Sequence, residues 1–509
     1  MENKEKYKLF RAIDGKAKRN DEKEPEHEFR SKFERDRDRV LYSKAFRRLS
    51  GKTQVFVTGY EDHIRTRLTH TLEVCQIATT IASYFGLDIA LTEAISLGHD
   101  IGHTPFGHEG ERFLNFIMNG CEEIKGINND ILDNEKGFKH NWQSFRVLTQ
   151  LEKKSLDFDG LNLTNYTLWG IVNHSELEWG KCKRFYLDKD NKKICSVNNS
   201  NLINKCKNNL RIDFYKENCN VFLKKIINNE SNESWTFEGL IVRQADEIAQ
   251  RHHDIEDGII ANLIDKEELI KKFIECFSEV KLYKEGKEYK DMVEKLNENI
   301  KTEYYLPILS RLIVDFLAMN LINNTEGNFN MLIDVYDIKS YQDFYDNKLE
   351  IYNKEKDIFG IVNYNENFGK QEKKFKEYLK NRILNSFKAQ SMDGKANYII
   401  KRLFKAYLSN PQQLPDKTIE SFYKNYNKNL TGIISEKEKE KIFSLPRLYG
   451  DLREKLKEDY FKKSNDSIYK CALLRTICDY VSGMTDNYAL NQYELLYGTK
   501  QRELRDFNL

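Results

Sequence analysis

Residues 99–111 read HDIGHTPFGHEGE, and the interpretation of the chain begins from this stretch. Three histidines and three acidic residues stand within it, set between glycine, proline and aliphatic residues. Histidine nitrogens and carboxylate oxygens bind divalent ions, and further His or Glu side chains beside an ion can transfer protons. The stretch therefore predicts a metal site with acid and base groups next to it.

His70 is a candidate ligand upstream of this stretch. Val74, Ile77 and Ile81 follow it at spacings of four, three and four residues. That period predicts a helix over about residues 68–85 with the imidazole on its apolar face. A single histidine on such a face can equally be a hydrogen-bonded core residue, so His70 gains weight only together with the other candidates.

Asp246 is a further candidate, on the apolar face of a second predicted helix. A carboxylate in such surroundings must be ion-paired or bound to metal, because an unpaired buried charge is costly. His99 and Asp100 are adjacent and cannot share one helix face, so we expect them where a helix ends and the chain turns. The sequence thus predicts one divalent ion held by His70, His99, Asp100 and Asp246.

These four residues resemble the H…HD…D signature of the HD-domain metal-dependent phosphohydrolases. Within that superfamily the chain resembles the deoxynucleoside triphosphate triphosphohydrolases, the dGTPase-like proteins. The resemblance implies an all-α fold in which additional N- and C-terminal helices elaborate an HD core. Further blocks that carry it are RDRDR at 35–39, KTQVF at 52–56, GFKHN at 137–141, LNLT at 161–164 and DYVSGMTD at 479–486.

Composition agrees with a helical fold. The 509 residues include only 6 Pro and 25 Gly, and 40% are hydrophobic, which favours helices around a large core. We expect a charged, poorly ordered N-terminal segment (1–30), a first part of the HD core with the metal and catalytic motifs (31–179), a Lys/Asn-rich insertion lobe (180–234), a second part with the fourth metal ligand (235–330), and a C-terminal helical region that completes the substrate pocket (331–509).

The resemblance also implies roles for four residues beside the metal. His108 is the candidate for in-line proton transfer near the scissile bond, and Glu111 would orient it from the next helical turn. His103 and His140 match positions close to the phosphates, where a protonated imidazole can offset developing charge. For His140 a structural alternative stays open, a histidine at a helix start that bonds a backbone carbonyl.

Substrate contacts are carried over from the same resemblance. Arg67 matches an arginine that holds phosphate oxygens, and Gln54 and Asp254 match positions that bind the sugar 3′-hydroxyl. Tyr480 is a candidate for packing near the sugar or base. The alternatives are a surface ion pair for Arg67, ordinary polar residues on helix surfaces for Gln54 and Asp254, and a core aromatic for Tyr480. The chain also departs from relatives that have Tyr four residues after the metal Asp, because Gln250 stands there.

The resemblance implies metal-dependent attack on the α-phosphorus of dGTP or several dNTPs, releasing deoxynucleoside and inorganic triphosphate. One ion per chain is expected, from among Mn, Mg, Fe, Co, Ni and Zn. Two imidazoles with two carboxylates suit the transition metals, whereas Mg prefers more oxygen ligands. Two alternatives stay open: another HD phosphohydrolase, such as a nucleotidase, and a non-catalytic regulator that binds nucleotides or single-stranded DNA.

Charge and cysteine content bear on the setting of the protein. The net charge of +2 gives no global basic field for nucleic acid. Nine Cys without a CxxC pair favour free thiols in a reducing compartment, and no apolar run approaches eighteen residues. We therefore expect a cytoplasmic enzyme with no membrane contact. The resemblance adds a homo-oligomer, tetramer or hexamer, and an activating nucleotide or single-stranded DNA as further partners.

Overall fold

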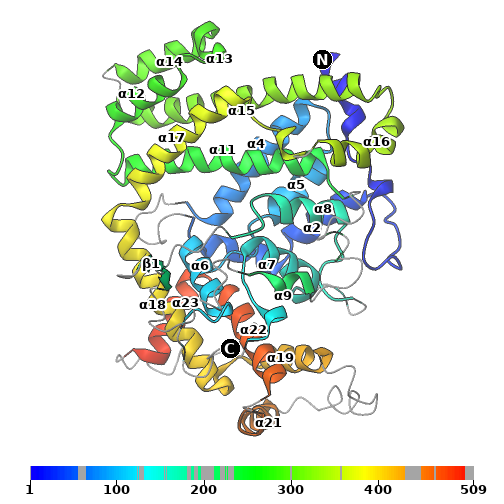
Figure 1. Cartoon of the computed structure of the whole chain (residues 1–509), viewed down its shortest axis with the longest axis vertical. Coiled ribbons are helices and arrows are strands. Elements are labelled where there is room, and N and C mark those ends of the chain that lie inside the picture. Colours follow the sequence, from blue (N-terminus) through cyan, green and yellow to red (C-terminus); the bar gives the residue numbers. More distant parts are fainter. Residues whose placement is uncertain are drawn as a thin grey trace. The chain divides into compact units, whose positions relative to one another are not determined.

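The chain is helical throughout most of its length, as the computed structural model in Figure 1 shows, and the all-α expectation is confirmed. Among the described residues the one sheet is a short antiparallel hairpin of β1 (Phe185–Leu187) and β2 (Lys193–Cys195), with Phe185 opposite Cys195. The structure describes all residues except 1, 55–64, 123, 125–130, 154, 156–157, 180–184, 188–192, 196–210, 218–223, 225, 227–233, 299–300, 356–357, 430–448, 464–465 and 499–509.

The residues group into two compact units, each made of separate stretches of the chain. The first consists of Met1–Gly102, His140–Leu177 and Cys219–Met392. The second consists of His103–Lys139, Glu178–Asn218 and Asp393–Leu509. Most of the expected insertion lobe lies outside the described residues, and the ranges expected from composition stay a prediction.

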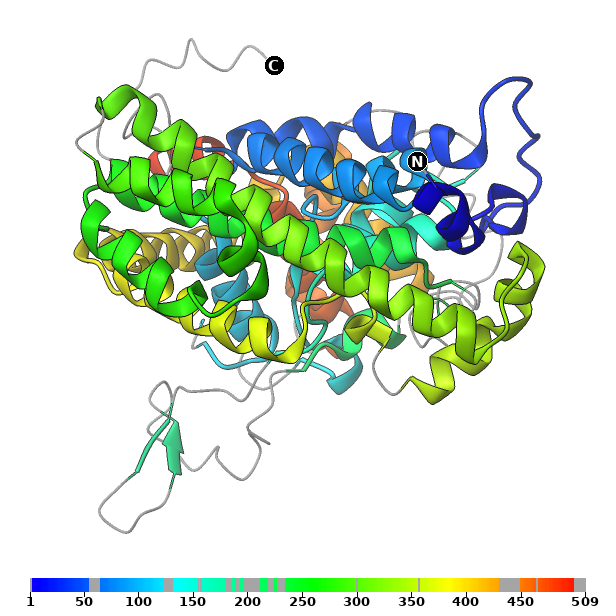
Figure 2. The ribbon, with the colours of Figure 1, turned by 90° about the horizontal axis from the view of Figure 1, so that it is seen from above.

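The central helix of the first unit is α11 (Phe237–Ile260). It packs against α4 (Arg67–Tyr84), α5 (Ile89–Gly98), α8 (Asn165–Asn173) and α15 (Thr302–Val335). The contact between α11 and α15 is seen in Figure 1, where α15 lies above α11, and Figure 2 shows these helices from above. This packing brings α11 against α4 and α5, which lie more than a hundred residues earlier in the chain.

The helix expected around His70 is α4, and it begins within a residue of the expected start. Thr66 caps it, because its hydroxyl accepts from the backbone of Thr69. His70, Val74 and Ile81 are buried together, as the spacing predicts, whereas Ile77 is only half-buried.

The other elements of the first unit surround these helices. They are α1 (Glu2–Tyr7), η1 (Lys8–Phe10), η2 (Asp14–Lys16), α2 (Lys32–Leu41), α3 (Lys44–Arg48), η3 (Leu49–Gly51), α7 (His140–Arg146), the π-helical turn η5 (Val147–Leu151), α12 (Lys266–Phe277), α13 (Lys281–Glu285), α14 (Lys287–Asn297), α16 (Tyr341–Lys354), η7 (Ile358–Gly360) and α17 (Glu366–Leu384). The helix α18 (Phe387–Ser409) begins in the first unit and continues in the second.

The N-terminal residues are ordered, and the expectation of poor order over 1–30 is wrong. Tyr7 and Phe10 are fully buried in the first unit. The Phe10 ring packs against Phe237 and Phe329 at centroid distances of 5.2 and 4.7 Å. Two aromatic anchors outweigh the charge of this segment, because each buries a large apolar area.

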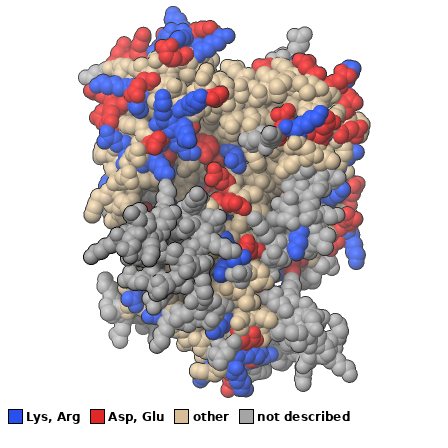
Figure 3. Space-filling view, in the orientation of Figure 1, with Lys and Arg blue, Asp and Glu red and all other residues tan. Residues whose placement is uncertain are grey.

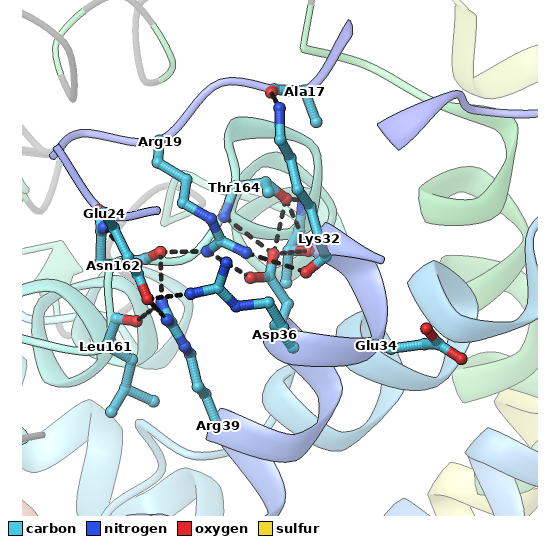
Figure 4. A network of polar contacts seen from close by, with 12 residues as sticks. Ala17, Arg19, Glu24, Lys32, Glu34, Asp36, Arg39, Leu161, Asn162 and Thr164 are labelled. Carbon is cyan, nitrogen blue, oxygen red and sulfur yellow. Dashed lines mark hydrogen bonds and ion pairs between the residues drawn. The ribbon is translucent and has the colours of Figure 1, made fainter. Parts of the chain in front are cut away.

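A buried polar network fixes the segment that follows (Figure 4). The Asp36 carboxylate on α2 accepts from Arg19 Nη1 at 2.7 Å, and from the backbone N–H and hydroxyl of Thr164 at 2.8 and 2.7 Å. Asp36 is fully buried, so these partners replace the water that a carboxylate loses on burial. Two of the sequence blocks that carry the resemblance, around 35–39 and 161–164, are therefore joined by hydrogen bonds from Thr164 to Asp36.

One helix of the first unit is long and apolar enough to cross a membrane by length and composition. It is α15, in which an 18-residue window has a mean hydropathy of 1.6 and is half buried. Within the unit α15 packs against α11, α14 and α4. These are the contacts of a core helix, and core helices of soluble proteins pass the same test.

The second unit packs α22 (Ser467–Ser482) against α19 (Asp416–Asn429) and α6 (Gly107–Met118). Aromatic rings line the contact between α19 and α22, where the ring centroids of Phe422 and Tyr469 lie 5.2 Å apart. The unit's other elements, besides the β1–β2 hairpin and part of α18, are η4 (Asp133–Glu135), α9 (Asp213–Glu217), η8 (Pro411–Gln413), α21 (Tyr449–Lys462) and α23 (Asp486–Tyr497).

Charges of both signs intermix over the described part of the face drawn in Figure 3. Lys and Arg side chains alternate with Asp and Glu there, in keeping with the formal net charge of +2. This face therefore presents no extended field of one sign.

Candidate metal centre

Three of the expected metal ligands converge inside the first unit. His70 comes from α4, His99 directly follows α5, and Asp246 comes from α11. One ligand atom from each lies within 4.8 Å of the others. His70 Nε2 lies 3.0 Å from Asp246 Oδ1, and His99 Nε2 lies 3.9 Å from the same oxygen.

Asp100 joins the same group. Its Oδ1 lies 3.5 Å from His99 Nε2, and its Oδ2 lies 3.9 Å from His70 Nε2. The Oδ2 atom also accepts a hydrogen bond of 2.7 Å from Arg67 Nη1. The structure therefore brings together all four residues that the sequence predicts as ligands.

The turn that carries His99 and Asp100 is held by close packing and by one hydroxyl. Ser144 Oγ accepts from the Gly102 N–H at 2.8 Å and donates to the His99 carbonyl at 2.9 Å. A Cβ at Gly102 would lie 2.1 Å from the backbone nitrogen of Ser144, and one at Gly98 would lie 2.4 Å from Ile171. The glycines on both sides of the His-Asp pair thus allow the turn to approach its neighbours.

The chemistry of the donor atoms fits a divalent ion. His99 Nδ1 donates to the Ser96 carbonyl at 2.6 Å, which leaves the lone pair on Nε2. This Nε2 is buried and makes no hydrogen bond within the described part of the chain. An imidazole nitrogen in that condition, beside two carboxylates, is suited to a metal.

Asp246 is ionised in these surroundings. Burial opposes its charge, but the hydrogen bond from His70 and the nearby His99 outweigh that effect and hold the pKa of Asp246 below its ordinary value. A carboxylate, rather than a carboxylic acid, therefore faces the two imidazoles.

A second pair of histidines lies beside His99. His174 donates from Nδ1 to the Ile171 carbonyl at 2.7 Å, so its Nε2 accepts from His140 Nε2 at 3.2 Å. Burial, followed by the charges of His99 and His140, lowers the pKa of His174 to about 3. His140 thus bonds another histidine through its Nε2.

Arg67 lies against the metal ligands with much of its hydrogen-bonding capacity unused. Its side chain is fully buried, and one nitrogen donates to Asp100. Nε and Nη2 are buried and make no hydrogen bond within the described residues. A buried guanidinium leaves donors unmatched at considerable cost, so this one is poised to bind an anion.

Two further residues, the buried His253 and the partly exposed Glu73, lie beside His70 on α11 and α4. His253 Nδ1 lies 3.1 Å from His70 Nδ1, and His253 Nε2 lies 2.5 Å from Glu73. Sequence reasoning missed both. The signal was the spacing, because His253 follows Asp246 by seven residues and Glu73 follows His70 by three, which places each on its ligand's helix face.

The sugar-binding candidates of the first unit are Gln54 and Asp254. Gln54 is buried, and its Oε1 makes no hydrogen bond within the described residues. Asp254 Oδ2 lies 3.8 Å from Arg251 Nη1 on α11. Burial raises the pKa of Asp254 to about 6, against the opposing effect of Arg251. A contact of either residue with the sugar stays a prediction.

The second unit contains the other three acid–base candidates. Ligand atoms of His103, His108 and Glu111 lie within 4.8 Å of one another. His108 Nδ1 is 3.5 Å from Glu111 Oε2, and the side chain of His108 is 58% exposed while that of Glu111 is 2% exposed. The spacing of three residues on α6 therefore produces the expected contact.

The turn before α6 depends on a late part of the chain. Phe106 has a φ of 63°, in the left-handed region that side chains rarely adopt. Its N–H donates to Asp486 Oδ1 at 2.9 Å, and Asp486 is fully buried. The resemblance block at 479–486 thus supports the start of the helix that carries His108 and Glu111.

Tyr480 lies in an aromatic cluster of the second unit. Its hydroxyl is 3.0 Å from that of Tyr488, and its ring centroid is 5.3 Å from that of Tyr407. Burial, together with the two neighbouring tyrosines, raises the pKa of Tyr480. A contact with sugar or base stays a prediction for this residue.

Comparison with known proteins places these features in a family context. The HD domain family matches residues 67–194, and the phosphohydrolase-associated domain matches 362–431 and 422–495. Three similar proteins are all named deoxyguanosinetriphosphate triphosphohydrolase-like protein. That of Geobacter metallireducens is 30% identical over 478 residues, covering 93% of this chain and 90% of its own. Those of Roseobacter denitrificans (29% over 493 residues; 94% and 95%) and Pelagibacter ubique (30% over 469 residues; 92% and 94%) match to a similar extent.

Proposed function

The chain belongs to the deoxyguanosinetriphosphate triphosphohydrolase-like family of HD-domain hydrolases, and from this premise we propose that it hydrolyses dNTPs to deoxynucleoside and inorganic triphosphate. The observation that carries the proposal is the buried Arg67 beside the metal ligands, with donors left for phosphate oxygens. A substrate with several phosphates makes fuller use of such a site than a monophosphate does.

His70, His99, Asp100 and Asp246 would hold one divalent ion per chain, which we propose to be Mn, Mg, Fe, Co, Ni or Zn. When bound, such an ion polarises a phosphoryl oxygen and lowers the pKa of a water molecule. The unbonded Nε2 of His99 and the ionised Asp246 support this ligand set.

Arg67 is proposed to hold the phosphate chain. Its Nη1 is engaged by Asp100, so Nε and Nη2 are the donors available to the substrate. His140, hydrogen-bonded to His174, and His103 would offset negative charge that develops on the phosphates.

His108 is proposed to transfer the proton to the leaving 5′ oxygen, with Glu111 orienting its ring. The exposure of His108 supports this role, because a group that donates a proton in each turnover must regain it from water. The buried Glu111 carboxylate accepts from Nδ1–H of His108, which would orient the ring so that Nε2 is the nitrogen that exchanges a proton with the substrate.

Gln54 and Asp254 are proposed to bind the 3′-hydroxyl, and Tyr480 to pack near the sugar or base. The unused Oε1 of Gln54 supports the first assignment. Gln250 stands where relatives have Tyr and so changes the residues proposed to contact the sugar. Rates of hydrolysis of dGTP and of the other three dNTPs measure which substrate is preferred. We also propose that the protein is a homo-oligomer, a tetramer or hexamer, and that a nucleotide or single-stranded DNA activates it. Light scattering with and without these ligands measures the oligomeric state and any change in it.

Product analysis tests the proposed reaction. Each of the four dNTPs is incubated with the protein and Mn²⁺ or Mg²⁺, and the products are resolved by ion-exchange chromatography. Deoxynucleoside plus tripolyphosphate supports the proposal. Accumulation of dNMP and pyrophosphate, or turnover of dNMP alone, would favour another HD phosphohydrolase. Tight binding without turnover, with activating nucleotides added in combination, would favour a regulator.

A further inference from the structure

Three side chains form an unbroken hydrogen-bonded chain that ends at a metal ligand. Glu73 Oε2 lies 2.5 Å from His253 Nε2, and His253 Nδ1 lies 3.1 Å from His70 Nδ1. His70 Nε2 lies on the far side of its ring, 3.0 Å from Asp246 Oδ1. All three residues belong to the first unit, on α4 and α11, and His70 and His253 are buried.

The positions of the protons follow from the bonding partners. A metal at His70 Nε2 takes the lone pair of that nitrogen, so the ring proton must be on Nδ1. His70 Nδ1–H then donates to His253 Nδ1, which leaves the proton of His253 on Nε2. That Nε2–H meets the Glu73 carboxylate, which accepts only, and every contact in the chain is therefore satisfied by one arrangement of protons.

We propose that Glu73 and His253 are positioning residues that fix the tautomer and the orientation of His70 and so strengthen metal binding. This inference rests on the proposed metal centre and deepens it. The usual partner of a metal-bound imidazole is a carboxylate or a backbone carbonyl. Here a second imidazole stands between the ligand and the carboxylate.

A different reading of the same residues is a second metal site, because ligand atoms of Glu73, His252 and His253 lie within 4.8 Å of one another. An ion at His253 Nε2 would move the proton of that ring to Nδ1, facing His70. The His70 proton would then move to Nε2, the atom that the first ion requires. The two ions would exclude each other, and Arg65, 3.0 Å from Glu73, opposes a second cation further.

The test compares His253→Phe with His252→Phe. Phe keeps the ring and removes both nitrogens. His252 is the matched control, because it also bonds Glu73, at 3.1 Å, but makes no hydrogen bond to His70 among the described residues. Affinity of the metal-free proteins for Mn²⁺ and Zn²⁺ is measured by competition with a chromophoric chelator, without nucleotide. We expect a loss of about 10–100-fold for His253→Phe and less than about threefold for His252→Phe.

Glu73 provides a second pair of variants should His253→Phe not fold. Glu73→Gln keeps an acceptor oxygen within reach of His253, whereas Glu73→Ala removes it. We expect affinity close to wild type for the first and about tenfold weaker for the second, at similar melting temperatures of the metal-free proteins.

The tautomer itself is observable in protein labelled with ¹⁵N-histidine and loaded with Zn²⁺. We expect His70 and His253 to be protonated at Nδ1 and Nε2, respectively. Equal metal affinity for the two Phe variants, binding of two Zn²⁺ per chain through Glu73, or a wild-type chain that binds no metal would each overturn the inference. If the metal affinities are as expected but no dNTP is hydrolysed, the proposed function is refuted, whereas the positioning role of Glu73 and His253 is supported.

Discussion

The two histidine clusters of the chain differ in their access to water. Around the candidate metal centre of the first unit, His70 and His99 are buried, and the Nδ1 atom of each is hydrogen-bonded to a neighbour. In the second unit, the side chain of His108 is 58% exposed beside the buried Glu111. Burial among packed neighbours keeps a ligand oriented, whereas exposure lets a proton-transfer group exchange with solvent. Residue types alone do not distinguish these tasks, but their surroundings do.

The largest effect should come from breaking the buried cluster. Asp246→Ala removes the carboxylate that faces both imidazoles, so metal and activity should be lost together. Elemental analysis of the purified variant measures the metal, and Asp100→Ala should behave in the same way. Stoichiometric metal in the Asp246→Ala protein would remove this residue from the ligand set.

The exposed cluster should respond differently to truncation. His108→Ala should retain the metal but lose roughly 10²–10⁴-fold in kcat, the range for a positioned acid or base. Steady-state kinetics on metal-loaded protein gives this number, with metal content determined on the same sample. Activity within a fewfold of wild type would show that His108 is only structural.

Substitution of Arg67 tests whether its unused hydrogen-bond donors bind phosphate oxygens. Arg67→Lys keeps a positive charge beside Asp100 but removes the planar set of donors, so KM for dNTP should rise about tenfold while the metal stays bound. An unchanged KM would return Arg67 to the role of an ion-pair partner.

The smallest effect concerns stability and pH at Asp254. Its pKa is raised from 3.8 to about 6 by burial, so the folded protein holds this proton more tightly than the unfolded chain. The resulting stabilisation is complete below pH 3.8 and is lost as the pH rises through about 6. Asp254→Asn should therefore be more stable than wild type at pH 8 by roughly 1–3 kcal/mol, and by about half as much at pH 5.

Denaturant unfolding at the two pH values measures this difference. The same variant should have a higher KM, because the proposed contact with the 3′-hydroxyl is weakened. A stability difference that does not change between pH 5 and pH 8 would contradict the role of burial at Asp254.

The sequence was sufficient for the parts of the site that follow one helix. The periodicity around His70 predicts α4, and the spacing of His108 and Glu111 predicts their contact. Contacts between helices were not readable in the same way. Nothing in the dipeptide His252-His253 indicates that only the second residue meets His70, because that depends on how α11 packs on α4.

The N-terminal segment shows the same limit. Tyr7 and Phe10 are isolated among charged residues, and the partners that bury them include Phe237 and Phe329, more than two hundred residues away. Composition predicts that such a segment is solvated, because it contains no information about a pocket formed by helices distant in the chain.

The most direct test of the central claim is dGTP hydrolysis by the metal-loaded protein in ¹⁸O-labelled water, followed by mass spectrometry of both products. Attack on the α-phosphorus with departure of the 5′ oxygen puts one ¹⁸O atom into the inorganic triphosphate and none into the deoxynucleoside. We predict this outcome for the wild-type protein. Label in the deoxynucleoside, or labelled dGMP with pyrophosphate, would contradict the account.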